Sequence, residues 1–164
     1  MLKKTFLLTL LVILSATKIF AQETKLYNPA ADAAADIDMA VKKARAENKF
    51  VLIQAGGNWC GWCIEFARFC NADHTIDSLI KSSFVSYHLN WNKENENKKI
   101  FEQYGYPQRF GFPVFIILNG QGERIHTQNS EYLEDGKKSY DPEKVRSFLE
   151  MWSPKALDPA AYKK

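Results

Sequence analysis

The sequence predicts an α/β fold in which a mixed β-sheet of at least four strands is flanked by helices. Three observations lead to this prediction. Short apolar runs alternate with segments of helical periodicity, as in parallel strands joined by crossover helices. The last two apolar runs are separated by a short Asn-Gly turn, which predicts an antiparallel hairpin. Finally, 164 residues with 46% hydrophobic and 25% charged side chains are typical of a single globular core.

The N-terminal stretch differs in composition from the rest of the chain. Lys3 and Lys4 precede a mostly apolar run at residues 6–14, and Ala21 is a small residue at a plausible cleavage point. A membrane-spanning helix needs roughly 20 apolar residues, about twice the length of this run. The pattern therefore predicts a cleaved signal peptide at residues 1–21, in preference to an uncleaved membrane anchor.

We expect residues 22–164 to form one domain with its core at about 33–152, exported across the inner membrane to the periplasm. Removing the signal peptide takes away three lysines and no acid from 22 basic and 19 acidic residues, which leaves a formally neutral chain. A neutral chain without a basic run gives no electrostatic basis for binding nucleic acid or anionic lipid. We therefore expect no nucleic-acid partner, no stable membrane insertion after cleavage, and a monomer.

The first part of the domain is expected to contain a helix, a strand and a second helix. The Ala-rich segment 31–48 places its apolar residues at helical spacing. The continuous apolar run 50–53 ends before a Gly56-Gly57 turn and is typical of a central strand buried on both faces. From Cys60 onward, apolar residues recur at i, i+3, i+4 and i+7, which predicts a helix that begins at Cys60.

The second part is expected to contain a strand, a helix, a hairpin and a closing helix. Asp141 followed by a proline and a glutamate has the N-cap, first-turn proline and early acid of a helix start. Residues 128–140 are interpreted as a charged, solvated loop. The expected ranges are 84–89 for the strand, 98–104 for the helix, 113–118 and 123–127 for the hairpin strands, and 141–152 for the closing helix.

The motif Trp59-Cys60-Gly61-Trp62-Cys63 lies where a buried strand leads into a helix. Unpaired N–H groups and the positive end of the helix dipole stabilise a thiolate, and the pKa of a cysteine so placed can fall to about 3.5–7.5. Cys60 is therefore the candidate nucleophile. Cys63 follows one turn later on the inner side, where it can attack a mixed disulfide, so it is the candidate resolving thiol.

With these elements in place, the chain resembles thioredoxin-like proteins, especially secreted bacterial ones, from about residue 33 to 152. The segments that carry the resemblance are the strand 50–53, the WCGWC motif, the segment 111–115, the Asn119-Gly120 hairpin and the closing helix. The resemblance implies a thioredoxin-like fold and identifies Pro113 as the cis-proline beside the cysteine pair. It also implies that Phe112, just before that proline, contacts the substrate chain.

The sequence departs from the family pattern at two places. Where thioredoxins have a buried acid that assists proton transfer, this chain has Gln54, which cannot ionise. His88 aligns with the lysine that partners that acid, so Gln54 and His88 mark the candidate proton-relay positions. His88 could act as a substitute base or be a strand histidine with a structural role only. Trp62 replaces the proline of thioredoxin and the histidine of disulfide isomerases, which puts the redox poise in doubt.

Three aromatic side chains, Trp59, Trp62 and Phe112, are expected to cluster around Cys60 and to form a substrate-binding surface. Such a surface suits an apolar or unfolded polypeptide. In the alternative interpretation, Trp59 packs under the motif and only Trp62 is exposed.

Two other functions stay open at this point. Cys60, Cys63, Cys70 and His74 could form a zinc site of three thiolates and one imidazole. However, Cys70 falls in the apolar stripe of its helix, where a buried inert cysteine explains it better. A thioredoxin fold could also serve as a redox-independent binding or chaperone module. We expect no metal and no cofactor.

The predicted function is therefore thiol-disulfide oxidoreductase activity in the cell envelope, with protein thiols and disulfides as substrates. The thioredoxin-like first half of the motif, and the absence of a histidine next to Cys63, favour a reductant over an oxidant. The expected redox partner is a membrane thiol carrier for a reductant, or an oxidant if the direction is reversed.

Overall fold

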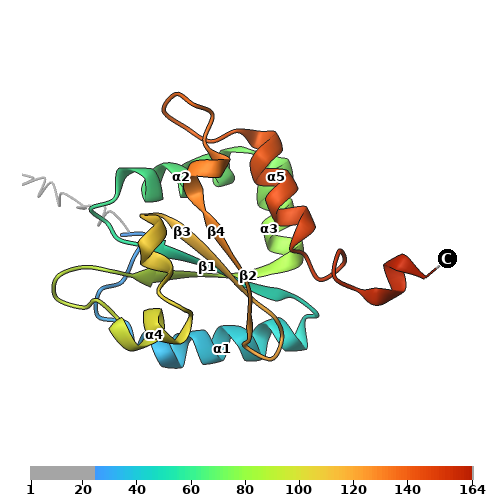
Figure 1. Cartoon of the computed structure of the whole chain (residues 1–164), viewed down its shortest axis with the longest axis horizontal. Helices are drawn as coiled ribbons and strands as arrows, with labels where there is room; N and C mark the ends of the chain where they lie inside the picture. Colours follow the sequence, from blue (N-terminus) through green and yellow to red (C-terminus); the bar gives the residue numbers. More distant parts are fainter. Residues whose placement is uncertain (1–24, 164) are drawn as a thin grey trace, which may run out of the picture.

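The computed structural model describes residues 25–163, so the expected signal peptide at 1–21 lies outside the described residues. A four-stranded sheet lies between two layers of helices (Figure 1). In chain order the elements are α1 (Ala33–Ala46), β1 (Phe50–Gly56), α2 (Gly61–Ala72), α3 (His74–Ser83), β2 (Phe84–Asn90), α4 (Lys98–Gln103), η1 (Pro107–Phe110), β3 (Val114–Leu118), β4 (Arg124–Asn129), η2 (Ser130–Leu133), α5 (Pro142–Met151) and η3 (Pro159–Tyr162).

The strands lie in the order β2-β1-β3-β4, which confirms the predicted mixed sheet. β1 pairs with β2 in parallel and with β3 antiparallel, and β3 pairs antiparallel with β4. β1 is therefore an inner strand, as its continuous apolar run predicted. In this register Gln54 lies opposite both His88 and Phe115.

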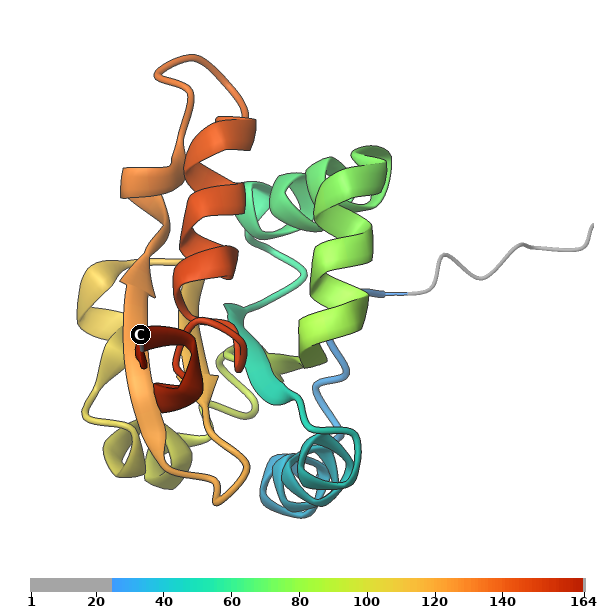
Figure 2. The ribbon, with the colours of Figure 1, turned by 90° about the vertical axis from the view of Figure 1, so that its right-hand side faces the viewer.

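Two apolar clusters fill the space on either side of the sheet. Alternate residues of a strand point to opposite faces, so Val51, Ile53 and Ala55 pack toward α1 and α4, whereas Leu52 packs toward α2, α3 and α5. The turned view in Figure 2 shows α1 on one side of the strands and α3 and α5 on the other. Gln54 shares the face of Leu52, which places its side chain on the side of α2.

Helix α3 was not predicted from the sequence. Asp73 accepts hydrogen bonds from the backbone N–H groups of Thr75 and Ile76 and so caps a new helix immediately after α2 ends. Ile76 anchors this helix in the core, where it is 1% exposed. Gly56, interpreted as part of a turn, is the last residue of β1 and pairs with Asn90.

The interpretation of residues 128–140 as a solvated loop holds for residues 135–138, which are exposed, but is wrong at both ends of the segment. β4 continues to Asn129, η2 follows, and Leu133 and Tyr140 are both buried. They are buried because the segment closes the cluster between the sheet, α2 and α5, where apolar side chains would otherwise face water. At the other end of the domain, Tyr27 is fully buried, so the core extends beyond the expected range of 33–152.

None of the helices within residues 25–163 combines the length and the apolar character needed to cross a bilayer.

Candidate active site

The cysteine pair lies between the end of β1 and the first turn of α2. Cys60 is the N-cap residue of α2, and a disulfide joins it to Cys63. The backbone N–H of Cys63 donates to the sulfur of Cys60 at 3.1 Å. Cys63 is fully buried, whereas Cys60 keeps a small exposed fraction of 5%. The predicted start of the helix at Cys60 is confirmed, and Cys60 is the outer of the two sulfurs.

The N-terminus of α2 favours negative charge on Cys60 once the disulfide opens. The N–H of Cys63 lies in the first turn of α2, where it donates to both the carbonyl and the sulfur of Cys60, each at 3.1 Å. The first turn of α2 carries no acidic residue that would repel an anion. The dipole of the helix adds to the same effect. Cys60 is therefore placed to react as a thiolate, as a nucleophile requires.

Phe112 and Pro113 precede β3, and the peptide bond between them is cis, as expected. β3 begins at Val114, which pairs with Ala55 near the end of β1 and so brings this segment to the cysteine pair. Phe112 packs against the apolar cluster that contains both cysteines. Its ring also meets Trp59 edge to face, with the centroids 5.6 Å apart.

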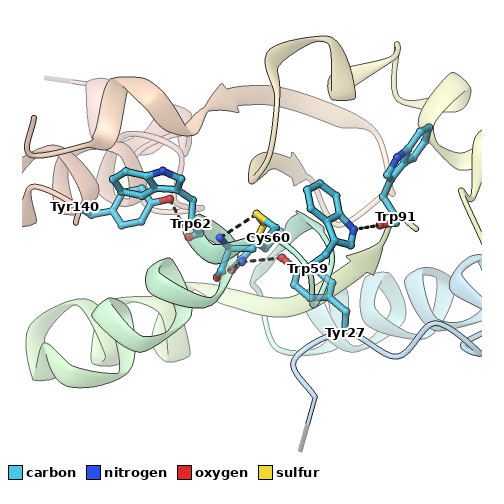
Figure 3. The surroundings of a disulfide bond; sticks show 8 residues. Tyr27, Trp59, Cys60, Trp62, Trp91 and Tyr140 are labelled. Carbon is cyan, nitrogen blue, oxygen red and sulfur yellow. Dashed lines mark hydrogen bonds between the residues drawn. A yellow bond between two sulfur atoms is a disulfide. The ribbon is translucent and has the colours of Figure 1, made fainter. Parts of the chain in front are cut away.

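The aromatic residues form an exposed rim, but the roles of the two motif tryptophans differ from the alternative considered above. Trp59 is the exposed one, at 59%, and its Nε1 donates to the backbone carbonyl of Trp91 at 2.7 Å. Trp62 is half-buried and meets Tyr140 edge to face, while the Tyr140 hydroxyl donates to the Trp62 carbonyl. Figure 3 shows the two tryptophans on opposite sides of Cys60. Of the two motif tryptophans, only Trp59 exposes most of its surface to a binding partner.

Beside Trp59 the surface is hollowed. Trp59 and Trp91 line a cavity of about 420 Å³ together with the loop that follows Trp91. Lys93, Glu94 and Glu96 bring both charge signs to the rim of this cavity. The cavity therefore combines aromatic walls with charged groups of both signs at its rim.

Behind the pair, Gln54 and Tyr27 fill the space around Cys63. The side-chain amide nitrogen of Gln54 donates to the Tyr27 hydroxyl and to the backbone carbonyl of Cys63, both at 2.8 Å. Gln54 is 5% exposed and Tyr27 is fully buried. His88 meets the Tyr27 ring edge to face, with the centroids 5.5 Å apart, and burial lowers the pKa of its imidazole. The two candidate relay residues therefore both contact Tyr27.

Gly56 makes this arrangement possible. A Cβ atom at position 56 would lie 2.4 Å from the Cys63 sulfur and 2.9 Å from the Tyr27 hydroxyl oxygen. Both distances are too short for real contacts, so only glycine lets the sulfur and the hydroxyl occupy this space.

Two residues at the site were not singled out from the sequence. Tyr27 lies before the expected core of residues 33–152, and no local pattern marks it. Tyr140 could have been found, because it directly precedes the N-cap Asp141 and shares an apolar cluster with Val145. An apolar side chain just before the cap, packed against the fourth helical residue, is the hydrophobic staple of a helix start.

The structure does not assemble the four ligands of the zinc alternative. Cys60 and Cys63 are joined to each other, whereas the Cys70 thiol is free and buried in the core on the α2 side. Burial raises the pKa of Cys70 to about 12, so this thiol stays protonated and inert at neutral pH. His74 begins α3. In the part of the chain that the structure describes, no three Cys, His, Asp or Glu side chains form a metal-binding group.

Comparison with known families and structures gives the same fold. A family described as thioredoxin-like matches residues 32–120, which is more than half of the chain. A disulphide isomerase from Xylella fastidiosa Temecula1 aligns with a TM-score of 0.66 and 22% identity, over 76% of this chain and 94% of that one. The C-terminal domain of DsbD from Neisseria meningitidis, in its oxidised form, aligns with a TM-score of 0.54 and 17% identity, over 74% of this chain and 97% of that one.

At these identities the two structures are evidence of fold alone. No curated protein matches the sequence.

Proposed function

We propose a function from one premise: the chain belongs to the thioredoxin-like family and, with its Cys60–Cys63 disulfide, is a thiol-disulfide oxidoreductase. We infer that it exchanges disulfides with protein substrates in the cell envelope and that it acts there as a reductant. The observation that carries this proposal is the placement of the pair, with Cys60 capping α2 and Cys63 sealed behind it.

The proposed cycle begins with both cysteines reduced. The Cys60 thiolate attacks a substrate disulfide, so a bond forms between Cys60 and one substrate sulfur while the other substrate sulfur leaves and takes a proton. Cys63 then loses its proton and attacks the Cys60 sulfur, which re-forms the Cys60–Cys63 disulfide and releases the second substrate thiol. Two electrons pass from the protein to the substrate, and a membrane thiol carrier must restore them.

Two features support a polypeptide substrate. Trp59 exposes most of its surface beside Cys60, and the cavity of about 420 Å³ next to it is open to a side chain of a bound segment. Phe112 and the cis-linked Pro113 lie on the same side, where the resemblance to the family places backbone pairing with the substrate. We therefore assign substrate binding to Trp59, Phe112 and Pro113, with Trp62 supporting the motif from its half-buried position.

The direction of electron transfer and the cellular compartment are inferred from the sequence. The predicted signal peptide supports export to the periplasm, and the thioredoxin-like first half of the motif supports reduction. The Xylella fastidiosa protein is described as a disulphide isomerase, which is a different use of the same fold. A measured potential separates these uses.

The test is a redox titration of the mature chain, with the fraction of Cys60–Cys63 disulfide read by thiol trapping. A reductant should give a potential near about −270 mV, as thioredoxin does, whereas a value near about −180 mV indicates an isomerase and one near about −120 mV a strong oxidant. Cys63→Ser should accumulate a mixed disulfide with a reporter protein, and Cys60→Ser should not. Equal trapping by both variants contradicts the assigned order of attack.

A further inference from the structure

The Tyr27 hydroxyl and the Cys63 sulfur face the same small space. The point at which a Cβ of residue 56 would lie is 2.9 Å from the Tyr27 oxygen and 2.4 Å from the Cys63 sulfur. Because residue 56 is glycine, no side-chain atom of its own separates the two groups. Tyr27, Cys60 and Cys63 form one buried cluster.

The hydrogen bonds of this cluster leave one donor uncommitted. Gln54 donates one amide hydrogen to the Tyr27 oxygen and the other to the Cys63 carbonyl, so both are used. The Tyr27 oxygen is therefore an acceptor, and its own hydroxyl hydrogen remains available. Since Tyr27 is fully buried, bulk water does not compete for that hydrogen.

Tyr27 is also held firmly in position. Its backbone N–H donates to the side-chain oxygen of Asn58 at 3.0 Å, and the side-chain nitrogen of Asn58 donates to the Tyr27 carbonyl at 2.8 Å. Asn58 lies two residues before Cys60. The segment that carries Tyr27 is thus tied directly to the loop that carries the motif.

The surroundings keep Tyr27 protonated. Burial raises the pKa of its hydroxyl, and no charged side chain among the described residues contributes to that shift. The titratable groups that contact Tyr27 and Cys63 are Cys60 at the start of α2 and His88 on β2, while Tyr140 before α5 interacts with Tyr27 through electrostatics. Burial lowers the pKa of His88 and raises that of Tyr140, so both favour their neutral forms.

We propose that Tyr27 supplies the hydrogen-bond donor that stabilises the Cys63 thiolate in the reduced protein, in the place where the family uses a buried acid. The inference rests on the proposed function, because it concerns the second step of the exchange. In that step the Cys63 thiol releases its proton to the solution, and the thiolate forms a bond to the Cys60 sulfur. The substrate sulfur leaves. Tyr27 keeps its own proton throughout.

The test uses the small aromatic disulfide dithionitrobenzoate, which releases one coloured thiol when Cys60 attacks it and a second when Cys63 resolves the mixed disulfide. Stopped-flow absorbance then separates the two steps, and the buried Cys70 does not react in the folded protein. Both rates are measured against pH for the wild type, for Tyr27→Phe, and for Tyr87→Phe as a matched control. Tyr87 also loses a hydroxyl with a hydrogen bond, but its partner is Asp36 of α1.

Losing the donor makes the thiolate less stable, so the pKa of Cys63 rises and less of it is ionised at neutral pH. We expect Tyr27→Phe to slow the second release about tenfold at pH 7 and to raise its pH midpoint by about one unit, which corresponds to ~1.4 kcal/mol. The first release should be unchanged, and Tyr87→Phe should behave as wild type. A purely structural role for Tyr27 would lower the unfolding midpoint without moving the pH midpoint.

Two results overturn the inference in distinguishable ways. If the first release proceeds but the second has the wild-type rate and midpoint in Tyr27→Phe, the inference is wrong and the proposed function stands. If the wild type gives neither release, both fail. Should Tyr27→Phe not fold, proton NMR of the reduced wild type replaces it. A downfield Tyr27 hydroxyl proton that appears as Cys63 ionises supports the inference, and its absence refutes it.

Discussion

The two sulfurs of the disulfide lie in opposite environments only one helical turn apart. Around Cys60 the neighbouring aromatic surface is open, with Trp59 at 59% exposure. Around Cys63 the side chains are buried, and the hydrogen bond from Gln54 to the Tyr27 oxygen involves no charged group. This difference supports the two proposals made above: the side of Cys60 meets the substrate, and the side of Cys63 controls the ionisation of the inner thiol.

The largest predicted effect comes from filling the buried space around Cys63. Gly56→Ala places a methyl group 2.4 Å from the Cys63 sulfur, and overpacking of this kind costs about 1–3 kcal/mol. We expect a loss of that size in the free energy of unfolding, measured with denaturant, and slower closure of the disulfide, measured by thiol trapping.

Gly61→Ala is the matched control for this substitution. It adds the same methyl group between the two cysteines, but nothing lies within 4 Å of the new atom. Stability and disulfide closure should be retained. A Gly56→Ala protein as stable as the Gly61→Ala protein would contradict the close packing described around Cys63.

A smaller effect is expected at the exposed aromatic surface beside Cys60. Trp59→Ala removes exposed aromatic surface and one hydrogen bond to the Trp91 carbonyl. The assay measures how fast the reduced protein reduces an unfolded substrate that contains a disulfide. We expect the KM for this substrate to rise about tenfold, which corresponds to ~1.4 kcal/mol, with little change in kcat.

Tyr162→Ala serves as the control, because Tyr162 is an even more exposed aromatic residue, at 74%. It lies in η3 near the C-terminus, a segment that Figure 1 shows away from the start of α2. If both substitutions change KM alike, Trp59 has no specific part in substrate binding.

The smallest effect concerns His88, which contacts Tyr27 in the buried region behind Cys63. Burial holds the pKa of its imidazole below the value of about 6.5 that it has in the unfolded chain. The unfolded state therefore takes up the proton first as the pH falls. The stabilising contribution of neutral His88 is present above about pH 6.5 and is lost as the pH falls toward the folded pKa.

Urea unfolding between pH 8 and pH 5 measures this contribution. His88→Gln should give a flatter dependence of the unfolding free energy on pH than the wild type, although His126, whose pKa burial also lowers, leaves a residual slope. Identical slopes in the two proteins would show that His88 does not titrate differently in the folded state.

Local patterns predicted most of the scaffold. The helix that starts at Cys60, the inner strand β1, the mixed sheet and the cis bond before Pro113 all appear as expected. Each depends on residues close in sequence, or on a resemblance carried by contiguous segments. Helix α3 was missed although Asp73 caps it, because it follows α2 without a glycine or proline to mark a boundary.

The inner half of the site could not be predicted in the same way. The Gln54 bond to Tyr27 spans 27 residues, and the Tyr140 bond to Trp62 spans 78. A single buried tyrosine ahead of the first helix belongs to no periodic pattern, so only the folded chain reveals its contacts. Gln54 was identified as a departure from the family pattern, but its partner was not.

The two hydrogen bonds between Tyr27 and Asn58 change where the functional domain begins. Helix α1 starts at Ala33, and the family match starts at residue 32, so either would be a natural point at which to trim the chain for expression. A protein shortened there would retain both cysteines and every regular element, yet it would open a hole behind Cys63. A shortened protein meant for redox measurements should therefore begin upstream of Tyr27.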